Sequence, residues 1–525
     1  MVATRAYTPL RMVLTVCGHC FSEDPDRVID YETDILQGNL IAQDGKVYLR
    51  RHCRRGHGEV ISLYEESYPL WQDLQQWRVP TKEVVPDTTG NYRPIPMGYL
   101  DGLGDLQTQH SCILLLDITE NCNLQCPTCF AESSPGIARH VPIENILRTL
   151  DTMIERENGR IDVLMLSGGE PTVHPQIMDI LRETAKRRVE RVIINTNGLR
   201  IARDNALTDL LGSLRGRLEV YLQFDGFELD SHLFHRGEDL RAVKREAIER
   251  LTDRRVFTTL AMAVAHGVND REVGRVAEYA FATDYIGGVA FQPVFGSGRS
   301  APIDIMDRLT TTGTLQRLGE QTGGVVGPED FIALPCSHPD CCAIAYFVVG
   351  DEGQFNSVTR LLGKERLKAN LDLVSNRIAA DEAALGQALM GMMSETTTIT
   401  RPELIDYVLT LCDNCDLGLA GLLRRFTSVV LRRELAAEPV SKRLKRLTIK
   451  SFMDAYTLNM ERLQQCCVHV GSTDGNANPV RIPFCARQLF GDLRRKTSAG
   501  QVPARQLIPL QRARSGERGV RDIRA

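Results

Sequence analysis

The chain has 525 residues, of which 43% are hydrophobic and 25% are charged, and this composition excludes a disordered or fibrous protein. At usual domain sizes the length predicts about three or four structural units. The 63 basic and 67 acidic residues give a net charge of −4, so the overall charge argues against a nucleic-acid partner. No run of 18 apolar residues occurs, and the first 20 residues lack the apolar core of a signal peptide. We therefore expect a cytoplasmic protein without a transmembrane segment.

Fifteen cysteines are the most unusual feature of the composition, and most of them occur in closely spaced groups. In a reducing cytosol, such groups indicate metal or redox chemistry more often than disulfide bonds. An odd number of cysteines also fits a complete disulfide framework poorly, and a chain of this length can bury a core without covalent cross-links. The cysteines therefore predict metal sites.

Residues 1–75 are predicted to form a small metal-binding domain. Cys17 and Cys20 form a CxxC pair, and a predicted strand later runs into Cys53 and His57. Two ligand pairs carried on turns and joined by short strands are typical of a knuckle that binds one tetrahedral metal ion. We expect one mononuclear iron or zinc ion at this site.

From residue 111 to residue 300, short apolar segments alternate with amphipathic helical stretches. The predicted strands are Ile113–Ile118, Val163–Ser167, Arg191–Asn195, Glu219–Phe224, Thr258–Val264 and Val289–Val294. This alternation is typical of parallel βα units, and right-handed crossovers would curl the sheet. Six units rather than eight predict an incomplete (β/α)6 barrel of the α/β class.

Composition predicts the remaining parts of the chain. Residues 76–110 contain several prolines and glycines and are predicted to be a linker. Residues 301–490 hold eight cysteines and are richer in helical signals, including a long stretch at Leu361–Met393. Residues 491–525 are rich in arginine with few apolar anchors, which is typical of a flexible basic tail.

The loop after the first predicted strand contains a CxxxCxxC motif, formed by Cys122, Cys126 and Cys129. Three thiolates on one tight loop can ligate three irons of a [4Fe–4S] cluster and leave the fourth iron open for a small molecule. The alternatives are a zinc loop with a distant fourth ligand, or a buried triple without a metal.

The next predicted strand ends in the sequence SGGEP, at Ser167–Pro171. Glycines allow the backbone to approach a ligand closely, and the Glu170 carboxylate can accept hydrogen bonds from an ammonium group. Taken alone, this sequence also fits an ordinary turn between a strand and a helix.

CxxxCxxC after one strand and GGEP after the next together resemble the radical S-adenosylmethionine (SAM) superfamily. The resemblance implies that Cys122, Cys126 and Cys129 hold a catalytic [4Fe–4S] cluster, whose open iron binds the amino and carboxylate groups of SAM. It also implies that reductive cleavage of SAM produces a 5′-deoxyadenosyl radical, which abstracts hydrogen from an unactivated carbon. The protein would tune the cluster, exclude water and orient the substrate.

Later strand ends carry further polar motifs in the same register, namely NTNG, QFDG, AHGVND and FQPV. Ligands of parallel α/β sheets bind at the carboxyl ends of the strands, although each of these motifs alone is more often a plain turn. The resemblance extends the predicted SAM site to Phe130, Gly168, Gly169, Glu170, Pro171, Gln223, Asp225 and Asn269.

Cys112 enters the first strand and is expected to be a small buried hydrophobic side chain. The eight late cysteines are Cys336, Cys341, Cys342, Cys412, Cys415, Cys466, Cys467 and Cys485. Eight thiolates make two complete ligand sets, so we interpret them as ligands of two auxiliary [4Fe–4S] clusters. Adjacent cysteines cannot easily face one ion, so the two adjacent pairs are expected to divide between two centres. One cluster or a zinc site is the alternative.

Over residues 12–490 the arrangement resembles the radical SAM family typified by archaeal tetraether lipid synthase. The shared features are the N-terminal CxxC with a later Cys/His pair, CNLxCPxCF, PCxHPxCC, and CCVHV followed by IPFCA. The resemblance implies a rubredoxin-like iron site, two auxiliary clusters, and carbon–carbon coupling of isoprenoid chains. Related members were earlier assigned as pterin methyltransferases. One departure is the three residues between Cys53 and His57, where the family commonly has two.

We therefore expect a radical SAM enzyme that acts on a lipid-like chain, with a one-electron donor of the flavodoxin or ferredoxin type and peripheral membrane contact. A lipid substrate predicts an elongated aliphatic cavity formed by the barrel and residues 301–490. A methyltransferase with a pterin-like substrate and a peptide-modifying enzyme are the other enzymatic hypotheses. A zinc-knuckle binding protein is the non-enzymatic one, and it leaves the GGEP motif and the barrel pattern unexplained.

Overall fold

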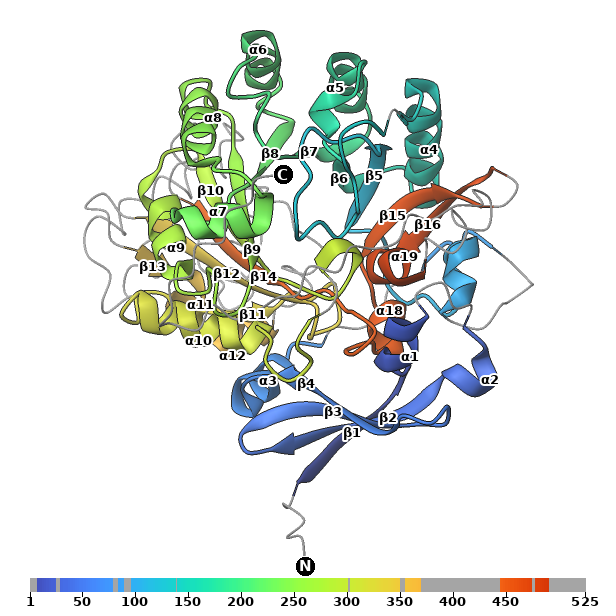
Figure 1. The fold of residues 1–525 in the computed structure, drawn as a ribbon. Coiled ribbons are helices and arrows are strands. Elements are labelled where there is room, and N and C mark those ends of the chain that lie inside the picture. Colours follow the sequence, from blue (N-terminus) through green and yellow to red (C-terminus); the bar gives the residue numbers. More distant parts are fainter. Residues whose placement is uncertain are drawn as a thin grey trace, which may run out of the picture.

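The computed structural model in Figure 1 describes residues 7–24, 29–78, 84–88, 96–137, 139–300, 303–349, 355–369, 444–474 and 477–490. Cys412, Cys415, most of the predicted helix at Leu361–Met393 and the predicted tail at 491–525 lie outside these residues. Among the helices of the described residues, none combines the length and the hydropathy needed to cross a bilayer.

The N-terminal part is a four-stranded antiparallel sheet, at the bottom of Figure 1. Its strands are β1 (Thr8–Thr15), β2 (Leu36–Gln43), β3 (Lys46–Cys53) and β4 (Gly58–Glu65), with α1 (Gly18–Glu23), α2 (Tyr31–Asp34) and α3 (Tyr68–Leu74) beside them. Alternate residues of β3 are buried, as expected for a strand with one covered face. Asp44 and Gly45 have positive φ angles, which the tight turn between β2 and β3 requires.

The central part contains the six predicted parallel strands in consecutive order. They are β5 (Ile113–Thr119), β6 (Ile161–Gly168), β7 (Val189–Thr196), β8 (Leu218–Gln223), β9 (Thr258–Val264) and β10 (Ile286–Pro293). The connecting helices are α4 (Ile143–Arg156), α5 (Ile177–Ala185), α6 (Asn205–Ser213), α7 (Leu229–Arg236), α8 (Arg241–Asp253) and α9 (Val273–Ala282). Most residues of these strands are buried, because helices cover the outer face and the curved sheet closes over the inner one.

Residues 301–490, which are richer in helical signals, also add six strands to this sheet. They are β11 (Ile332–Ala333), β12 (Cys342–Val349), β13 (Phe355–Ser357), β14 (Leu444–Lys450), β15 (Val468–Thr473) and β16 (Pro479–Pro483). β14 extends the parallel sheet beside β10, and β15 extends it beside β5. Within the described strands the order is a path that ends at β11 and β16, so the barrel is incomplete.

The remaining short elements connect these strands. They are η1 (Met97–Asp101), η2 (Pro171–Val173), η3 (Gly298–Ser300), α10 (Thr311–Gln321), η4 (Pro328–Asp330), α11 (Val358–Leu362), α12 (Lys364–Ala369), α18 (Met460–Gln464) and α19 (Phe484–Phe490). Parts of the segment that we expected to be a linker pack into the main core, including Trp77, Tyr99 and Leu103.

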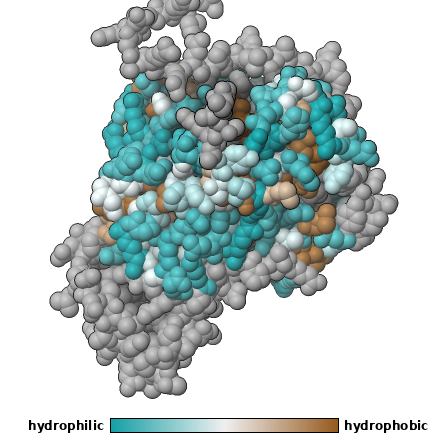
Figure 2. Space-filling model, turned by 90° about the horizontal axis from the view of Figure 1, so that it is seen from below, coloured by the Kyte–Doolittle hydropathy of each residue, from teal (hydrophilic) through white to brown (hydrophobic). Residues whose placement is uncertain are grey.

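The N-terminal sheet packs against the loop that carries the PCSHPDCC sequence. Asp340 of this loop is buried and accepts hydrogen bonds from Tyr64 (2.7 Å), Trp71 (2.8 Å) and Gln75 (2.6 Å). Burial alone would raise the pKa of Asp340. The positive charges nearby outweigh burial, so the pKa lies below its usual range. Figure 2 shows the molecule from this end, where the described surface is mostly hydrophilic with small separated hydrophobic patches.

Candidate functional site

A cavity at the carboxyl ends of the parallel strands brings most of the predicted site residues together. Its lining includes Cys122, Cys126, Cys129, Phe130, Gly168, Gly169, Glu170, Asn195, Asn197, Tyr221, Gln223, Arg236, Ala263, Gln292, Val294, Phe295 and Phe452. Each strand from β7 to β10 contributes one of its last residues, because the carboxyl ends of parallel strands meet at one edge of the sheet. The polar motifs that follow successive strands therefore line one shared cavity.

The CxxxCxxC loop holds its three thiols around one side of this cavity. Arg299 fixes the loop, because its Nε donates to the Cys126 carbonyl (2.7 Å) and its backbone N–H donates to the Cys129 carbonyl (2.9 Å). Burial raises the pKa of Cys122 to about 12 and also raises the pKa of Cys129. Thiols in such surroundings become thiolates only when a positive charge, such as a metal centre, compensates them.

The SGGE turn packs directly against the segment that leads into the cysteine loop. A Cβ atom on Gly168 would lie 2.2 Å from the Thr119 carbonyl oxygen, and one on Gly169 would lie 2.1 Å from the Asn121 carbonyl oxygen. The Gly169 N–H donates to Thr119 (2.7 Å), and the Glu170 N–H donates to Asn121 (2.9 Å). The glycines thus allow backbone to meet backbone, in addition to lining the cavity.

Glu170 lines the cavity but is only 1% exposed. Its Oε1 accepts hydrogen bonds from Thr172 and Thr196, and its Oε2 accepts one from the Asn197 N–H (2.7 Å). An ionised carboxylate has about four acceptor positions, so Oε2 keeps capacity for a further donor from the cavity. The geometry suits binding of an ammonium group.

Three residues that we predicted to bind SAM do not line the cavity. Pro171 begins η2, Asn269 ties Asp225 and Ala263 together through 2.8 Å hydrogen bonds, and Asp225 is fully buried. Asp225 instead binds Arg236, which lines the cavity, through bonds of 2.6 and 2.8 Å. Burial alone raises the pKa of Asp225, but the Arg236 charge outweighs burial and holds this pKa below its usual range. These residues support the cavity from behind.

Sequence analysis missed two cations behind the cysteine loop, the partly buried Arg236 and the fully buried Lys244. The Arg236 Nη1 lies 3.9 Å from the Cys126 sulfur, and the Lys244 Nζ donates to the Asn197 carbonyl (2.6 Å). Burial lowers the pKa of Lys244 to about 7. A signal for Lys244 existed in the sequence, because it falls on the same helix face as the apolar residues Ala247 and Leu251 of α8.

The N-terminal group contains all four predicted ligands. The ligand atoms of Cys17, Cys20, Cys53 and His57 lie within 4.8 Å of one another, and the His57 Nδ1 is 3.4 to 3.6 Å from the three sulfur atoms. Glu23 is 2.9 Å from Nε2 of His57, which directs Nδ1 toward the thiols. The extra residue between Cys53 and His57 therefore does not prevent a tetrahedral arrangement.

Cys336 and Cys467 form a group of thiols with Cys112, a residue that we had expected to be only a small buried hydrophobic side chain. Cys112 is fully buried as expected, but the three sulfur atoms lie within 4.8 Å of one another. The reason is strand pairing, since Cys112 and Cys467 immediately precede the parallel neighbours β5 and β15. We call Cys112, Cys336 and Cys467 the first auxiliary group.

We call Cys341, Cys466 and Cys485 the second auxiliary group, because these thiols influence one another electrostatically. Their sulfur atoms do not all lie within 4.8 Å of one another, unlike those of the first auxiliary group. Arg462 donates to the Cys341 sulfur (3.4 Å), and the Met453 N–H donates to the Cys485 sulfur (3.4 Å). Burial raises the pKa values of all three thiols, that of Cys485 to about 11.

Cys466 thus belongs to the second auxiliary group and Cys467 to the first, as we predicted for two adjacent cysteines. Cys342 is buried at the start of β12, in the electrostatic reach of Cys336 and Cys341. Each auxiliary group has three thiols among the described residues, rather than the four that we expected.

Aromatic side chains connect the second auxiliary group to the cavity. Phe484 precedes Cys485, and its ring centroid lies 5.8 Å from that of Phe130, which follows Cys129. Phe452 lines the cavity, and its ring is tilted against that of Phe484 with the centroids 4.6 Å apart. The cavity and the second auxiliary group therefore share an apolar wall.

Residues 116–280 match the Radical SAM superfamily. Over 95% of its length the chain is 24% identical to the 7,8-dihydro-6-hydroxymethylpterin dimethyltransferase of Methanocaldococcus jannaschii, 96% of which is covered. A 28% identical match covers 35% of the chain and 40% of the antilisterial bacteriocin subtilosin biosynthesis protein AlbA of Bacillus subtilis. Among solved structures, SuiB of Streptococcus suis bound to precursor peptide SuiA is 14% identical, with a TM-score of 0.34 over 41% of this chain and 46% of SuiB.

The superfamily implies a [4Fe–4S] cluster and SAM, and the residues of the cavity fit both groups. Three thiols line one side, and a carboxylate with spare acceptor capacity lies near them. The auxiliary groups are compatible with further clusters. We conclude that the chain contains a radical SAM domain and is a radical SAM enzyme.

Proposed function

We propose that this radical SAM enzyme modifies unactivated carbon atoms of a lipid alkyl or isoprenoid chain, with carbon–carbon coupling as the class of reaction. The observation that carries the proposal is the apolar wall of the cavity. Phe130, Phe295 and Phe452 line it beside the cysteine loop, and Val294 lies among them. A saturated chain has no polar group by which it can be held, so only such a surface can position it.

In this proposal Cys122, Cys126 and Cys129 hold the catalytic cluster, and Oε2 of Glu170 receives the amino group of SAM. When bound, these groups supply a 5′-deoxyadenosyl radical that removes hydrogen from an unactivated carbon. The apolar wall of the cavity positions the substrate. Abstraction requires the target carbon within about 3–4 Å of the radical carbon, and each buried methylene contributes about 0.8 kcal/mol to holding it there.

The other metal groups have assigned roles in this proposal. The first and second auxiliary groups hold auxiliary [4Fe–4S] clusters, together with Cys342 and with Cys412 and Cys415, which lie outside the described residues. Cys17, Cys20, Cys53 and His57 hold one iron or zinc ion, because three thiols and one imidazole suit either metal. The geometry of four ligands around one point supports a mononuclear site.

A pterin-directed methyltransferase is the second candidate function, and the polar side of the cavity supports it. Gln223 and Gln292 line the cavity, and Gln292 donates to the Tyr221 hydroxyl (2.9 Å). The side-chain Oδ1 atom of Asn195 is buried and has no hydrogen-bond partner among the described residues. A heterocyclic ring could use these groups for hydrogen bonding, and the Methanocaldococcus jannaschii relative is named as a pterin dimethyltransferase.

Anaerobic turnover assays distinguish the two functions. Reconstituted enzyme is incubated with SAM, a reductant, and either a cellular lipid extract or a reduced pterin, and 5′-deoxyadenosine is quantified. We expect the lipid extract to increase its formation and yield a product with a new carbon–carbon bond. Stimulation by pterin or by peptide, with no response to lipid, would contradict the lipid proposal.

Two variants of the cavity provide matched controls. Phe452→Ala should weaken the response to lipid about tenfold, because a large part of the apolar wall is removed. Gln292→Leu should leave the lipid response intact while it removes a polar contact that a pterin would need. The reverse pattern favours the methyltransferase.

A further inference from the structure

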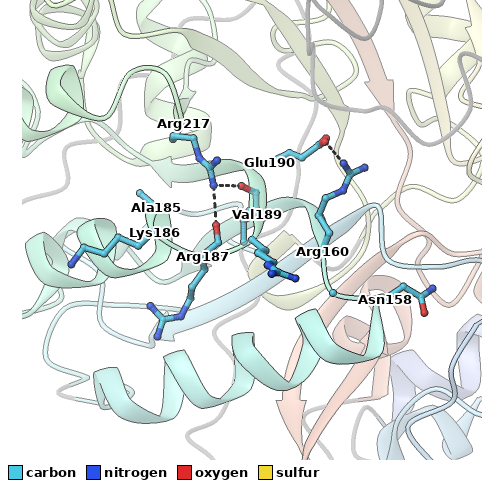
Figure 3. Close-up of a pocket in the computed structure, with 10 residues that line it drawn as sticks. Asn158, Arg160, Ala185, Lys186, Arg187, Val189, Glu190 and Arg217 are labelled. Carbon is cyan, nitrogen blue, oxygen red and sulfur yellow. Dashed lines mark hydrogen bonds and ion pairs between the residues drawn. The ribbon is translucent and has the colours of Figure 1, made fainter.

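A second concave surface lies away from the cavity, at the amino-terminal ends of β6, β7 and β8. Its lining comes from residues 158–160, residues 185–190 and Arg217, and Figure 3 shows these side chains. Five of the lining residues are cationic, namely Arg160, Lys186, Arg187, Arg188 and Arg217. Glu190 is the single carboxylate in this lining. We call this surface the basic groove.

Part of the positive charge of the basic groove is not compensated within the chain. Arg160 pairs with Glu190 (2.7 Å), Lys186 pairs with Glu183 of α5, and Arg187 pairs with Asp151 of α4. Arg188 and Arg217 have no carboxylate partner among the described residues. Arg217 is exposed and instead donates to the carbonyl groups of residues 187 and 189, which hold its guanidinium group in place (Figure 3).

A chain of side-chain contacts leads from the basic groove to the first auxiliary group. Arg160 donates to Asp162 (3.4 Å), Asp162 lies 3.9 Å from the His110 Nε2, and that nitrogen lies 3.6 Å from the Cys112 sulfur. Arg160 is well exposed, His110 is partly exposed, and Cys112 is fully buried. The groove is therefore the surface beside this buried thiol group.

From the first auxiliary group, adjacent cysteines lead toward the catalytic end of the barrel. Cys467 belongs to the first group and Cys466 to the second, which shares the wall of Phe484 and Phe130 with the cavity. A direct path would be long, because Cys112 and the catalytic loop lie at opposite ends of β5, about 20 Å apart for seven residues. The two auxiliary groups divide this length into shorter steps.

We propose that the basic groove is the docking surface for an acidic one-electron donor protein, and that electrons enter through the first auxiliary group. The inference rests on the proposed cluster sites of the auxiliary groups. A reduced iron–sulfur or flavin protein gives up one electron and is oxidised, and a cluster held by Cys112, Cys336 and Cys467 is reduced by that electron. The second auxiliary group then passes it toward the catalytic cluster.

Charge complementarity is the reason for an acidic protein as partner. Uncompensated cations on one concave surface attract an acidic partner, increase its association rate and lose this effect at high salt. A phosphate-bearing ligand or an anionic membrane would also be attracted, but neither would explain why the groove adjoins a buried thiol group. A redox protein uses both features.

The test compares two reductants of the same reconstituted enzyme. Reduced flavodoxin is an acidic protein donor, whereas dithionite is a small molecule that needs no docking surface. Lys186→Glu with Arg188→Glu reverses two exposed charges of the groove without touching a thiol. We expect the apparent KM for flavodoxin in 5′-deoxyadenosine formation to rise about tenfold, and its salt dependence to weaken. The dithionite-driven rate should not change.

Arg203→Glu with Arg271→Glu is the matched control. Both residues are exposed, and they lie after the carboxyl ends of β7 and β9, at the opposite end of the sheet. This control has the same change in charge and should keep the wild-type KM for flavodoxin. An equal rise in KM for both double variants would overturn the docking site in favour of a general charge effect.

Three further outcomes distinguish a failure of the docking proposal from a failure of the proposed function. Dithionite-driven activity with an unchanged flavodoxin KM in the groove variant would overturn the docking proposal and leave the radical SAM chemistry standing. Loss of binding to phosphatidylglycerol vesicles by the groove variant, with unchanged flavodoxin kinetics, would identify a membrane surface instead. Absence of 5′-deoxyadenosine with dithionite in the wild-type enzyme would contradict the proposed cluster sites on which this inference rests.

Discussion

The catalytic cavity and the first auxiliary group are built in opposite ways. Cys122, Cys126 and Cys129 come from one loop, and the turn that faces them follows the next strand. The first auxiliary group collects Cys112, Cys336 and Cys467 from three distant parts of the chain. The comparison teaches that ligands on one loop depend on local spacing, whereas ligands at strand ends depend on which strands become neighbours.

The largest effect is expected from breaking the local motif. Cys126→Ala removes one of three thiolates from the catalytic loop, and the remaining two cannot hold the cluster. We expect complete loss of reductive SAM cleavage, measured as anaerobic 5′-deoxyadenosine formation. Thr128→Ser, in the same loop, keeps the hydroxyl that contacts His235 and should retain activity. Wild-type cleavage by the Cys126 variant would refute the assigned cluster site.

Removing a ligand of the first auxiliary group should lower the metal content without abolishing SAM cleavage. Three clusters and one mononuclear site predict about thirteen irons per chain when the mononuclear site holds iron. Cys112→Ala should lower this number by about four while dithionite-driven SAM cleavage continues, because the catalytic loop is unchanged. Iron analysis and electron paramagnetic resonance after reconstitution measure both effects.

A second metal count serves as the control for this experiment. Replacing Cys17 and Cys20 together by alanine should cost one metal ion and leave the auxiliary clusters in place. An iron content near four or five in the wild-type enzyme would mean that the late cysteines and Cys112 do not bind clusters.

The buried pair behind the catalytic loop tests how tertiary contacts support a local motif. Arg236→Gln leaves the Asp225 carboxylate buried without its bidentate partner, which should cost about 3 kcal/mol of unfolding free energy. Asp225→Asn combined with Arg236→Gln removes both charges and should regain most of this loss. Anaerobic denaturant unfolding of the three proteins measures the difference. Equal stability of the wild type and the Arg236→Gln variant would show that the ion pair is not important for the fold.

The last prediction concerns β14, an inner strand between β12 and β10 that sequence analysis missed. Burial lowers the pKa of Lys445 in β14 to about 8, whereas an unfolded lysine titrates at about 10.4. Between these values the unfolded chain binds more protons, so the free energy of unfolding should rise with pH by about 3 kcal/mol from this group. Below pH 8 lysine is charged in both states and the contribution is constant.

Lys445→Met removes this titration and is compared with the wild type. The difference in denaturation midpoint between the two proteins should change between pH 8 and pH 10.5 and stay level below pH 8. A constant difference across this range would contradict the assigned pKa.

The sequence by itself determined the six central strands, the catalytic loop, the SGGE turn and the N-terminal ligand set. All of these rest on short-range patterns, namely apolar runs of strand length and ligands a few residues apart. Such patterns depend on residues that are close together in the sequence. β14 escaped detection because its buried positions hold Lys445 and Arg446, which are satisfied by the Thr283 and Ile286 carbonyls and by Glu219. An inward-facing cation disguises a buried strand as a polar one.

Only the tertiary structure decided the membership of the auxiliary groups and the roles behind the cavity. Cys112 joins Cys467 because β15 pairs with β5, and no local pattern records which strand lies at an open edge of the sheet. In the same way only the tertiary structure showed that the Asp225 side chain pairs with Arg236, because the direction of a side chain at a strand end depends on packing. Pairing and packing are properties of the whole fold, since the free energy that selects them comes from contacts between distant segments.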